Sequence, residues 1–209
     1  MLSTRTSKRT FLSVALGLTL TAVAGLSAAS DWDVDTSHSR VAFMVRHMMV
    51  SNVRGTFGKF TGGVLLDDQD ITKSTVNLDI DVASINTETP KRDDHLRSAD
   101  FFDVAKFPKM VFKSTKVAKD GDGLSVTGNL TIKNVTKPVV LKVTPLSAET
   151  KDPWGGVRRG ASATTKISRK DFGLTWNKAL DGGGVVVGDE VSLDIEVELV
   201  KKVAEAKKS

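Results

Sequence analysis

Residues 124–132 read LSVTGNLTI, and in this stretch apolar and polar side chains alternate in strict period two. Such alternation is typical of a β-strand that buries one face and exposes the other. The pattern breaks at residues 134–138, NVTKP, and resumes from Val139. The two runs therefore predict a β-hairpin whose inward face includes Val126, Leu130 and Leu141.

The same alternation recurs at 40–48, 76–83 and 191–199, and residues 53–66 form an extended run with several glycines. Glycines inside strands mark bulges, bends or close backbone approach, which a sheet closing on itself requires. The turns are short and there is no βαβ rhythm. We predict an all-β chain folded as a single extended antiparallel β-barrel of about eight strands, with one or two short helical connections; a sandwich is the alternative.

One connection differs from the strands around it. Residues 92–108 read RDDHLRSADFFDVAKFP, and Pro90 just before them suits the first position of a helix. Asp93 and Arg97 have the spacing of a helical ion pair, and Ser98 can cap a second short turn. Arginine, histidine, aspartate and phenylalanine together suit a cap over an apolar cavity with charges at its rim. A plain connecting helix with solvated charges and buried phenylalanines is the alternative.

The first residues have the pattern of a secretory signal peptide. A basic start precedes an uncharged apolar run at 11–26, and Ser27, Ala28 and Ala29 offer a small-residue cleavage site. We expect export, with cleavage near Ala29 and a signal peptide spanning 1–29. A retained anchor is the alternative, but the run is shorter than the ~20 residues of a membrane span. Residues 30–200 are then the barrel, and 201–209 a basic, frayed tail.

Composition excludes several functions. Removing residues 1–29 leaves a net charge of about +2 from Lys, Arg, Asp and Glu, and no basic face with stacking aromatics is visible, so we expect no nucleic-acid partner. The chain has no cysteine, so neither disulfides nor thiol chemistry are available. The fold must be held by core packing and sheet hydrogen bonds.

No motif for catalysis or metal binding stands out. His38, His47 and His95 match no compact metal spacing, and there is no Gly-x-Ser-x-Gly elbow or phosphate loop. We therefore expect no catalytic residue, no metal and no cofactor. Two alternatives stay open: a hydrolase of a lipid headgroup that uses His95 and an aspartate, and a structural, stress-protective protein with a filled core.

Several blocks of the chain, in order, resemble the YceI-like family. They are DTSHSRVAF at 35–43, SNVRGTF at 51–57, FTG at 60–62, RDDHLRSADFFD at 92–103 with FP at 107–108, GNLTI at 128–132, VTKPV at 135–139, DPWG at 152–155 and RKDFG at 169–173. The chain departs from the family pattern at Asn129, often Asp, and at Asn134, often Gly; neither position touches the proposed cavity.

The resemblance implies a lipocalin-like barrel in the periplasm that holds a long apolar amphiphile, such as a polyisoprenoid, an isoprenoid quinone or a fatty-acid-like lipid. It implies no catalytic activity. The expected partners are this lipid and, transiently, a membrane or membrane protein, and the chain is expected to be a monomer or homodimer. The candidate cavity residues are Val41, Phe43, Val45, Leu78, Ile80, Phe101, Phe102, Val126, Leu130, Leu141, Leu193 and Ile195. The candidate residues of a polar mouth are His38, Arg92, His95, Arg97, Trp154, Asp171 and Trp176.

Overall fold

Twelve β-strands make up most of residues 29–203, the part of the chain that the computed structural model describes. The predicted signal peptide and the end of the tail lie largely outside this range. In chain order the strands are β1 (Ala29–Val34), β2 (Arg40–His47), β3 (Ser51–Phe57), β4 (Phe60–Asp67), β5 (Thr75–Asp81), β6 (Ile85–Asn86), β7 (Lys109–Asp120), β8 (Gly123–Ile132), β9 (Val135–Val143), β10 (Thr150–Lys151), β11 (Val157–Ser168) and β12 (Val187–Lys201).

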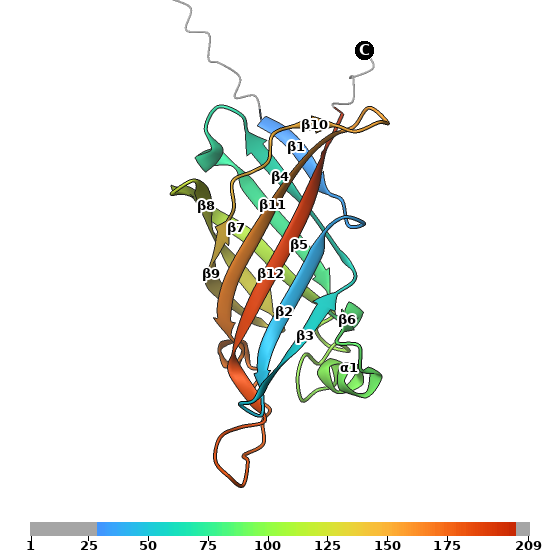
Figure 1. Ribbon diagram of the computed structural model, residues 1–209, viewed down its shortest axis with the longest axis vertical. Helices are drawn as coiled ribbons and strands as arrows, with labels where there is room; N and C mark the ends of the chain where they lie inside the picture. Colours follow the sequence, from blue (N-terminus) through green and yellow to red (C-terminus); the bar gives the residue numbers. More distant parts are fainter. Residues whose placement is uncertain (1–28, 204–209) are drawn as a thin grey trace, which may run out of the picture.

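Eight of these strands close into a ring. Their order around the ring is β11, β9, β8, β7, β5, β4, β1 and β12, and β12 pairs with β11 to close it. β2 pairs with β12 beyond the end of β1, so that β2, β3 and β6 extend the wall toward the lower end in Figure 1. All pairings among these strands are antiparallel. The predicted antiparallel barrel is confirmed, and the sandwich is not formed.

The strand register follows the hydrophobic alternation. In the predicted hairpin, β8 pairs with β9 so that Val126 lies opposite Leu141. Two interior glycines lie where an inward ring approaches the backbone. A Cβ at Gly128 would come within 2.3 Å of the Phe112 ring, and one at Gly55 within 2.4 Å of the Phe43 ring. These glycines therefore make room for phenylalanine inside the barrel.

The helical connections are short, as expected. They are η1 (Ile71–Lys73), η2 (Val82–Ser84), α1 (Pro90–Arg97) and η3 (Arg169–Phe172), of which only α1 is an α-helix. Pro90 is at the start of α1, as predicted from the sequence. Among the residues described, no helix is both long enough and apolar enough to span a membrane.

The predicted ion pair between Asp93 and Arg97 is wrong. Asp93 is buried, and its carboxylate accepts hydrogen bonds from the backbone N–H and the hydroxyl of Thr87 at 2.8 and 2.6 Å. Arg97 pairs instead with Asp94, at 3.1 Å. The reason is that Asp93 faces the preceding loop, where the buried Thr87 needs an acceptor. The half-buried guanidinium of Arg97 already has Asp94 and the carbonyls of Ala83 and Ile85 as acceptors.

Candidate functional site

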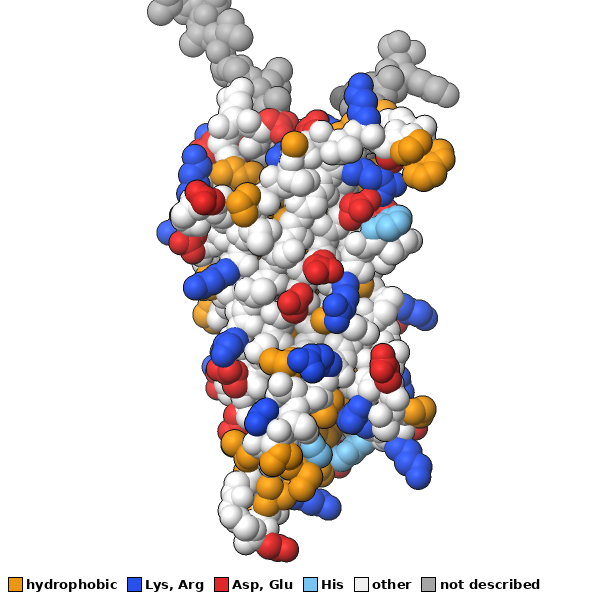
Figure 2. All heavy atoms as spheres, in the orientation of Figure 1, with side chains coloured by type: hydrophobic (Ala, Val, Ile, Leu, Met, Phe, Trp, Pro, Cys, Tyr) orange, Lys and Arg blue, Asp and Glu red, His pale blue; other side chains and the backbone are white. Residues whose placement is uncertain are grey.

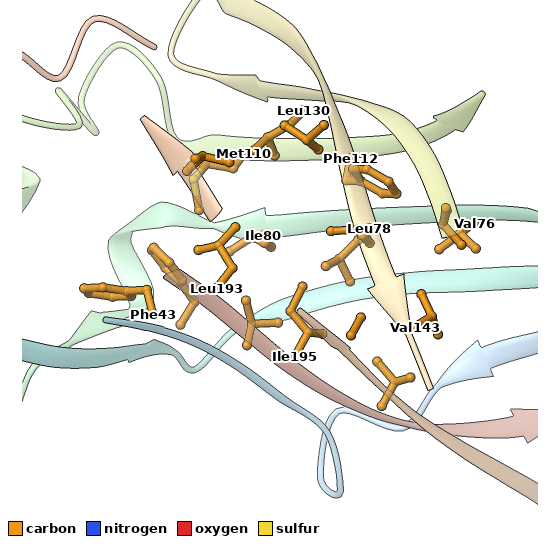
Figure 3. Close-up of a pocket in the computed structure, with 18 of the residues that line it drawn as sticks. Phe43, Val76, Leu78, Ile80, Met110, Phe112, Leu130, Val143, Leu193 and Ile195 are labelled. Carbon is orange, nitrogen blue, oxygen red and sulfur yellow. The ribbon is translucent and has the colours of Figure 1, made fainter. Parts of the chain in front are cut away.

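An elongated apolar cavity of about 240 Å³ runs along the inside of the barrel (Figure 3). On β12 the lining begins at Val187 and ends at Leu199, a span of about 40 Å along the strand at ~3.3 Å per residue. The polar side chains in the lining are Ser74, Asn77 and Arg169. Each already has a hydrogen-bond partner within the protein, so the wall presents an apolar surface along its length.

The structure places all twelve predicted cavity residues on this wall. Ten come from strands, and Phe101 and Phe102 come from the segment after α1. Those from strands are Val41, Phe43 and Val45 on β2, Leu78 and Ile80 on β5, Val126 and Leu130 on β8, Leu141 on β9, and Leu193 and Ile195 on β12. Their contact with a ligand stays a prediction, because what the structure gives is their position.

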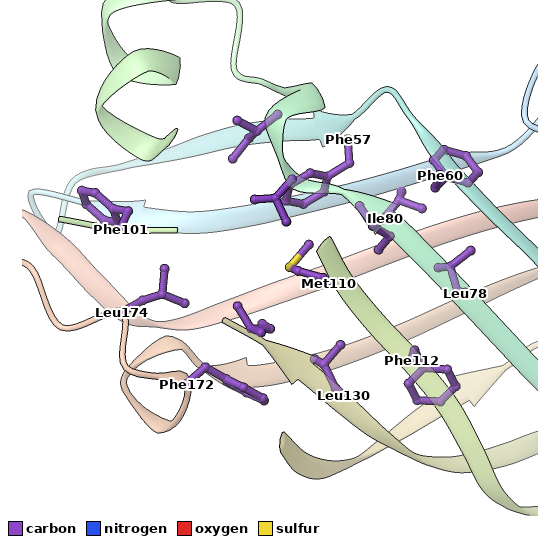
Figure 4. Close-up of a cluster of buried hydrophobic side chains, with 14 of the residues drawn as sticks. Phe57, Phe60, Leu78, Ile80, Phe101, Met110, Phe112, Leu130, Phe172 and Leu174 are labelled. Carbon is purple, nitrogen blue, oxygen red and sulfur yellow. The ribbon is translucent and has the colours of Figure 1, made fainter. Parts of the chain in front are cut away.

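Aromatic rings fill part of the lower half of the barrel (Figure 4). The ring of Phe57 lies 5.6 Å from that of Phe43 and 6.1 Å from that of Phe102. Phe172 and Leu174 are buried in the same cluster. Several of these rings come from strand ends and connections, such as Phe57 at the end of β3 and Phe102 after α1. The interior is therefore packed in part and hollow in part.

The wall splits between β9 and β11 in this lower half. These strands pair only at Val143 with Ala163 and at Lys142 with Thr164. Below that point the edges of β9 and β11 separate, and η3 contacts both of them. The buried ring of Phe172 on η3 belongs to the core cluster. A loop rather than a hydrogen-bonded ladder therefore completes the wall at this place.

Arg169, in the RKDFG block, holds this loop in place, a role for which the local sequence carries no signal. It is buried, and its side chain donates to the backbone carbonyls of Gly188, Leu174, Trp176 and Val187 and to the carboxylate of Asp189. Its burial lowers the pKa of the guanidinium below its ordinary range. A buried arginine next to an apolar cavity suggests headgroup binding, but here all five N–H groups already have acceptors.

The predicted polar mouth is not one group. Arg92 and Arg97 lie on α1 at the lower end, where they hold the helix to its neighbours. Arg92 donates to the hydroxyl and carbonyl of Thr87, and Arg97 donates to the carbonyls of Ala83 and Ile85. Neither residue lines the cavity. Their observed contacts are structural, and binding of a headgroup by them stays a prediction.

His95 and Trp176 also lie at the lower end, behind the cavity wall. The imidazole is 2.8 Å from the Asp100 carboxylate, and its ring packs edge-on against Phe101 and Trp176 at centroid distances of 5.0 and 4.8 Å. Of these residues only Phe101 lines the cavity. The pair of histidine and aspartate that a hydrolase would need thus exists, but outside the apolar chamber. Asp171, on η3, is exposed.

His38 and Trp154 lie toward the opposite, upper end, so grouping them with the other five was wrong. His38 is in the loop between β1 and β2, and Trp154 is 85% exposed in the turn between β10 and β11. The physical reason is topological. The loop with His38 and the turn with Trp154 are at one end of the strands, and α1 is at the other end. Motifs that follow one another in the sequence can therefore lie at opposite ends of the barrel.

An ion-pair network lies beside His38. The Arg158 guanidinium donates to the carboxylates of Asp35, Asp152 and Glu198. Hydrogen bonds from His38 and Arg158 hold the pKa of Asp35 well below its ordinary value of 3.8, and the bond to Asp35 raises the pKa of His38 above 6.5. Asp35, His38 and Glu198 bring potential metal ligands within 4.8 Å of one another, but the guanidinium already supplies the positive charge there.

Comparison with known proteins found a matching family model, similar sequences and similar solved structures. A family model described as the YceI-like domain matches residues 32–199. A UPF0312 protein of Enterobacter sp. (strain 638) is 41% identical over 197 residues, covering 93% of this chain and 98% of that protein. Protein YceI of Salmonella newport (strain SL254) is 40% identical over 192 residues, covering 90% and 97%. The crystal structure of Burkholderia cenocepacia BcnA has a TM-score of 0.70 at 26% identity, covering 79% of this chain and 99% of BcnA.

Proposed function

The chain belongs to the YceI-like family, and on that premise we propose that it binds one long apolar amphiphile inside the barrel. The single observation that carries this proposal is the lining: it stays apolar for the length of β12 from Val187 to Leu199, and its polar groups are already bonded. Such a wall offers dispersion contacts and dehydration but no directional partner. It favours a hydrocarbon chain over a polar metabolite.

The shape of the cavity favours a linear ligand. A closed eight-stranded barrel is just wide enough to be filled by side chains or to hold one small ligand, and about 240 Å³ is below the usual ~300–1,000 Å³ of drug-sized sites. A thin, flexible chain such as a polyisoprenoid, an isoprenoid quinone tail or a fatty-acid-like lipid fits these dimensions better than a fused ring system does. An apolar tube discriminates poorly among such chains, so we propose the class and not a single lipid.

The setting of this binding is part of the proposal. The signal-like start supports export to the periplasm, with the barrel carrying its lipid there, in transient contact with a membrane or membrane protein, as a monomer or homodimer. We propose a binding protein without catalytic activity, metal or cofactor. The position of His95 and Asp100 behind the wall supports this, because an aliphatic ligand inside the chamber would not reach them.

Native mass spectrometry of the exported protein tests the proposal directly. The expected result is an adduct with the mass of a long-chain lipid, lost on organic extraction. Protein purified from the periplasm without any such adduct, and unable to take up a long-chain lipid after extraction, would favour the filled-core structural protein instead.

Enlarging inward side chains separates a ligand chamber from a packed core. We expect that at least one of Val126→Phe, Leu193→Phe and Ile195→Phe leaves the melting temperature of delipidated protein nearly unchanged and abolishes lipid retention. In a packed core each change would instead cost ~1–3 kcal/mol of folding free energy. Uniform destabilisation with lipid still bound would place the ligand elsewhere.

A further inference from the structure

The turn between β2 and β3 shows three consecutive apolar side chains to solvent at the lower end of the barrel. Met48, Met49 and Val50 are 44%, 54% and 75% exposed, and Figure 2 shows hydrophobic side chains gathered at this end of the molecule. Single exposed apolar residues are ordinary, but a contiguous group at the tip of a structure marks a contact site. We call residues 48–50 the apolar turn.

The backbone of the apolar turn is unfavourable for the residues it contains. Met48 and Met49 have φ values of 48° and 62°, and the Val50 N–H donates to the His47 carbonyl at 3.0 Å. His47 pairs with Ser51, so the loop has three residues, and Met48 and Met49 are the two central residues of the β-turn within it. Two consecutive left-handed residues at the centre of a turn are the setting in which Asn-Gly is preferred. Methionine gains nothing from this left-handed backbone, and about half of each residue stays exposed to solvent. Folding therefore does not account for the two methionines, and a role on the surface does.

The apolar turn is continuous with the cavity. Met48 donates its N–H to the carbonyl of Val186 at 2.8 Å. The next residue, Val187, pairs with His47 in the sheet and lines the cavity. Val45, three residues before Met48, also lines the cavity. The lower end of the chamber and the exposed side chains are thus separated by one or two residues along both β2 and β12.

The charges around the apolar turn favour an anionic surface. Arg46 and Arg54 on the hairpin are exposed, as is Lys178 in the loop that leads to β12, whereas the acid exposed on these two segments is Asp181. The Arg46 guanidinium donates to the carbonyl of Met49 at 3.0 Å, which keeps a positive charge beside the apolar side chains. Apolar residues flanked by cations are the composition with which peripheral proteins enter the headgroup region of anionic bilayers.

We infer that the apolar turn and the flanking cations form a docking surface for an anionic lipid bilayer, at the end of the barrel where the lipid chain leaves or enters. This assignment rests on the proposed lipid-binding function and names the partner from which that lipid comes. Met48, Met49 and Val50 enter the interface, and Arg46, Arg54 and Lys178 contact the phosphates of the headgroups.

Vesicle flotation of the mature protein tests the assignment. The probes are vesicles of phosphatidylethanolamine with phosphatidylglycerol, and vesicles of phosphatidylcholine alone. We expect binding to the anionic vesicles, weakened by salt, and about a tenfold or greater loss in the variant Met48→Asn, Met49→Gly, Val50→Ser, since interfacial binding scales with buried apolar area. Asn-Gly suits this turn, so the variant should melt at or above the temperature of the unaltered protein.

Matched controls lie elsewhere on the surface. Trp154→Ser at the upper end and Val140→Ser on the barrel side also remove exposed apolar side chains, and both should bind vesicles as the unaltered protein does. Equal losses in all three variants would overturn the docking surface. So would unchanged vesicle binding in the turn variant, or a shift in its oligomeric state without any change in vesicle binding, which would identify a second copy of the chain as the partner.

The same preparations separate this assignment from the proposed function. Native mass spectrometry reads the internal lipid independently of vesicle binding. Protein that holds lipid but does not bind anionic vesicles would overturn the docking surface alone. Protein that binds vesicles through the apolar turn but never holds lipid would count against the proposed function and would keep the docking surface.

Discussion

The two ends of the barrel are closed in different ways. At the upper end the indole of Trp32, fully buried, packs with Leu66 and Leu199 on three adjacent strands, and the Arg158 network fastens the loop beside them. At the lower end the strands separate, and connections complete the wall: α1, η3 and the segments after them (Figure 1). A ladder of strands resists opening more than loops do. We therefore expect lipid exchange at the lower end.

Removing the upper seal should have the largest effect on stability. Trp32→Ala empties a site that is 0% exposed, and large-to-small changes of a buried tryptophan cost ~3–5 kcal/mol. Urea unfolding followed by circular dichroism measures this loss. Trp154→Ala, which removes an indole that is 85% exposed, is the matched control and should change the free energy of unfolding by less than ~0.5 kcal/mol. Similar losses in both variants would contradict the role assigned to the upper end.

Removing the clamp of the lower end should have the next largest effect, and a more local one. Arg169→Met leaves the carbonyls of Gly188, Leu174, Trp176 and Val187 without this donor, which should cost about 2–3 kcal/mol. Hydrogen exchange should quicken chiefly in residues 169–187, and the rate of lipid exchange should rise. Lys170→Met, next in sequence but with a half-exposed side chain, serves as the control. Protection lost evenly over the whole barrel would mean that the lower end is not an independent unit.

The smallest predicted effect concerns pH at the upper end. Because the pKa of His38 is raised above 6.5 in the folded protein by Asp35, the protonated imidazole stabilises the fold below that pH. This contribution is lost as pH rises through the raised pKa. Denaturant midpoints between pH 5.5 and 8 should fall slightly in the unaltered protein and stay flatter in His38→Gln. The lowered pKa of Asp35 also stabilises the fold, but this contribution is lost as the pH falls, and only below about pH 4. Parallel pH profiles for both proteins would exclude His38 from the network.

Alternation of side chains was sufficient to predict the strands and the inward face of several of them, while the interior glycines favoured a barrel over a sandwich. Side chains of a strand alternate between the two faces of the sheet. The local pattern of apolar and polar residues therefore shows which side chains face inward. That is why Val126, Leu141, Leu193 and Ile195 line the cavity as expected. The same reasoning predicted α1 from Pro90 and the spacing after it, since helix starts are local signals.

Local rules could not give the distribution of polar residues between the two ends. Arg92, His95 and His38 all looked like parts of a mouth, because each lies in a charged or conspicuous motif. Whether a loop is at the upper or the lower end depends on how many strands separate it from the others, and strand ends are the least certain feature of a sequence-based prediction. The structure places His38 beside Glu198 on β12 and His95 beside Trp176 after η3.

The sequence by itself thus determined the all-β class, the inward side of β2, β5, β8, β9 and β12, the short helical connections and the family, because these depend on residue type and spacing over a few positions. Only the tertiary structure decided what each charged group pairs with. Asp93 turned to Thr87 and not to Arg97, and Arg169 became a clamp for four carbonyls that come from residues 5 to 19 positions later in the chain. The partner of a charged side chain depends on desolvation and on the geometry between different elements. Its role is therefore determined only once these elements have packed together.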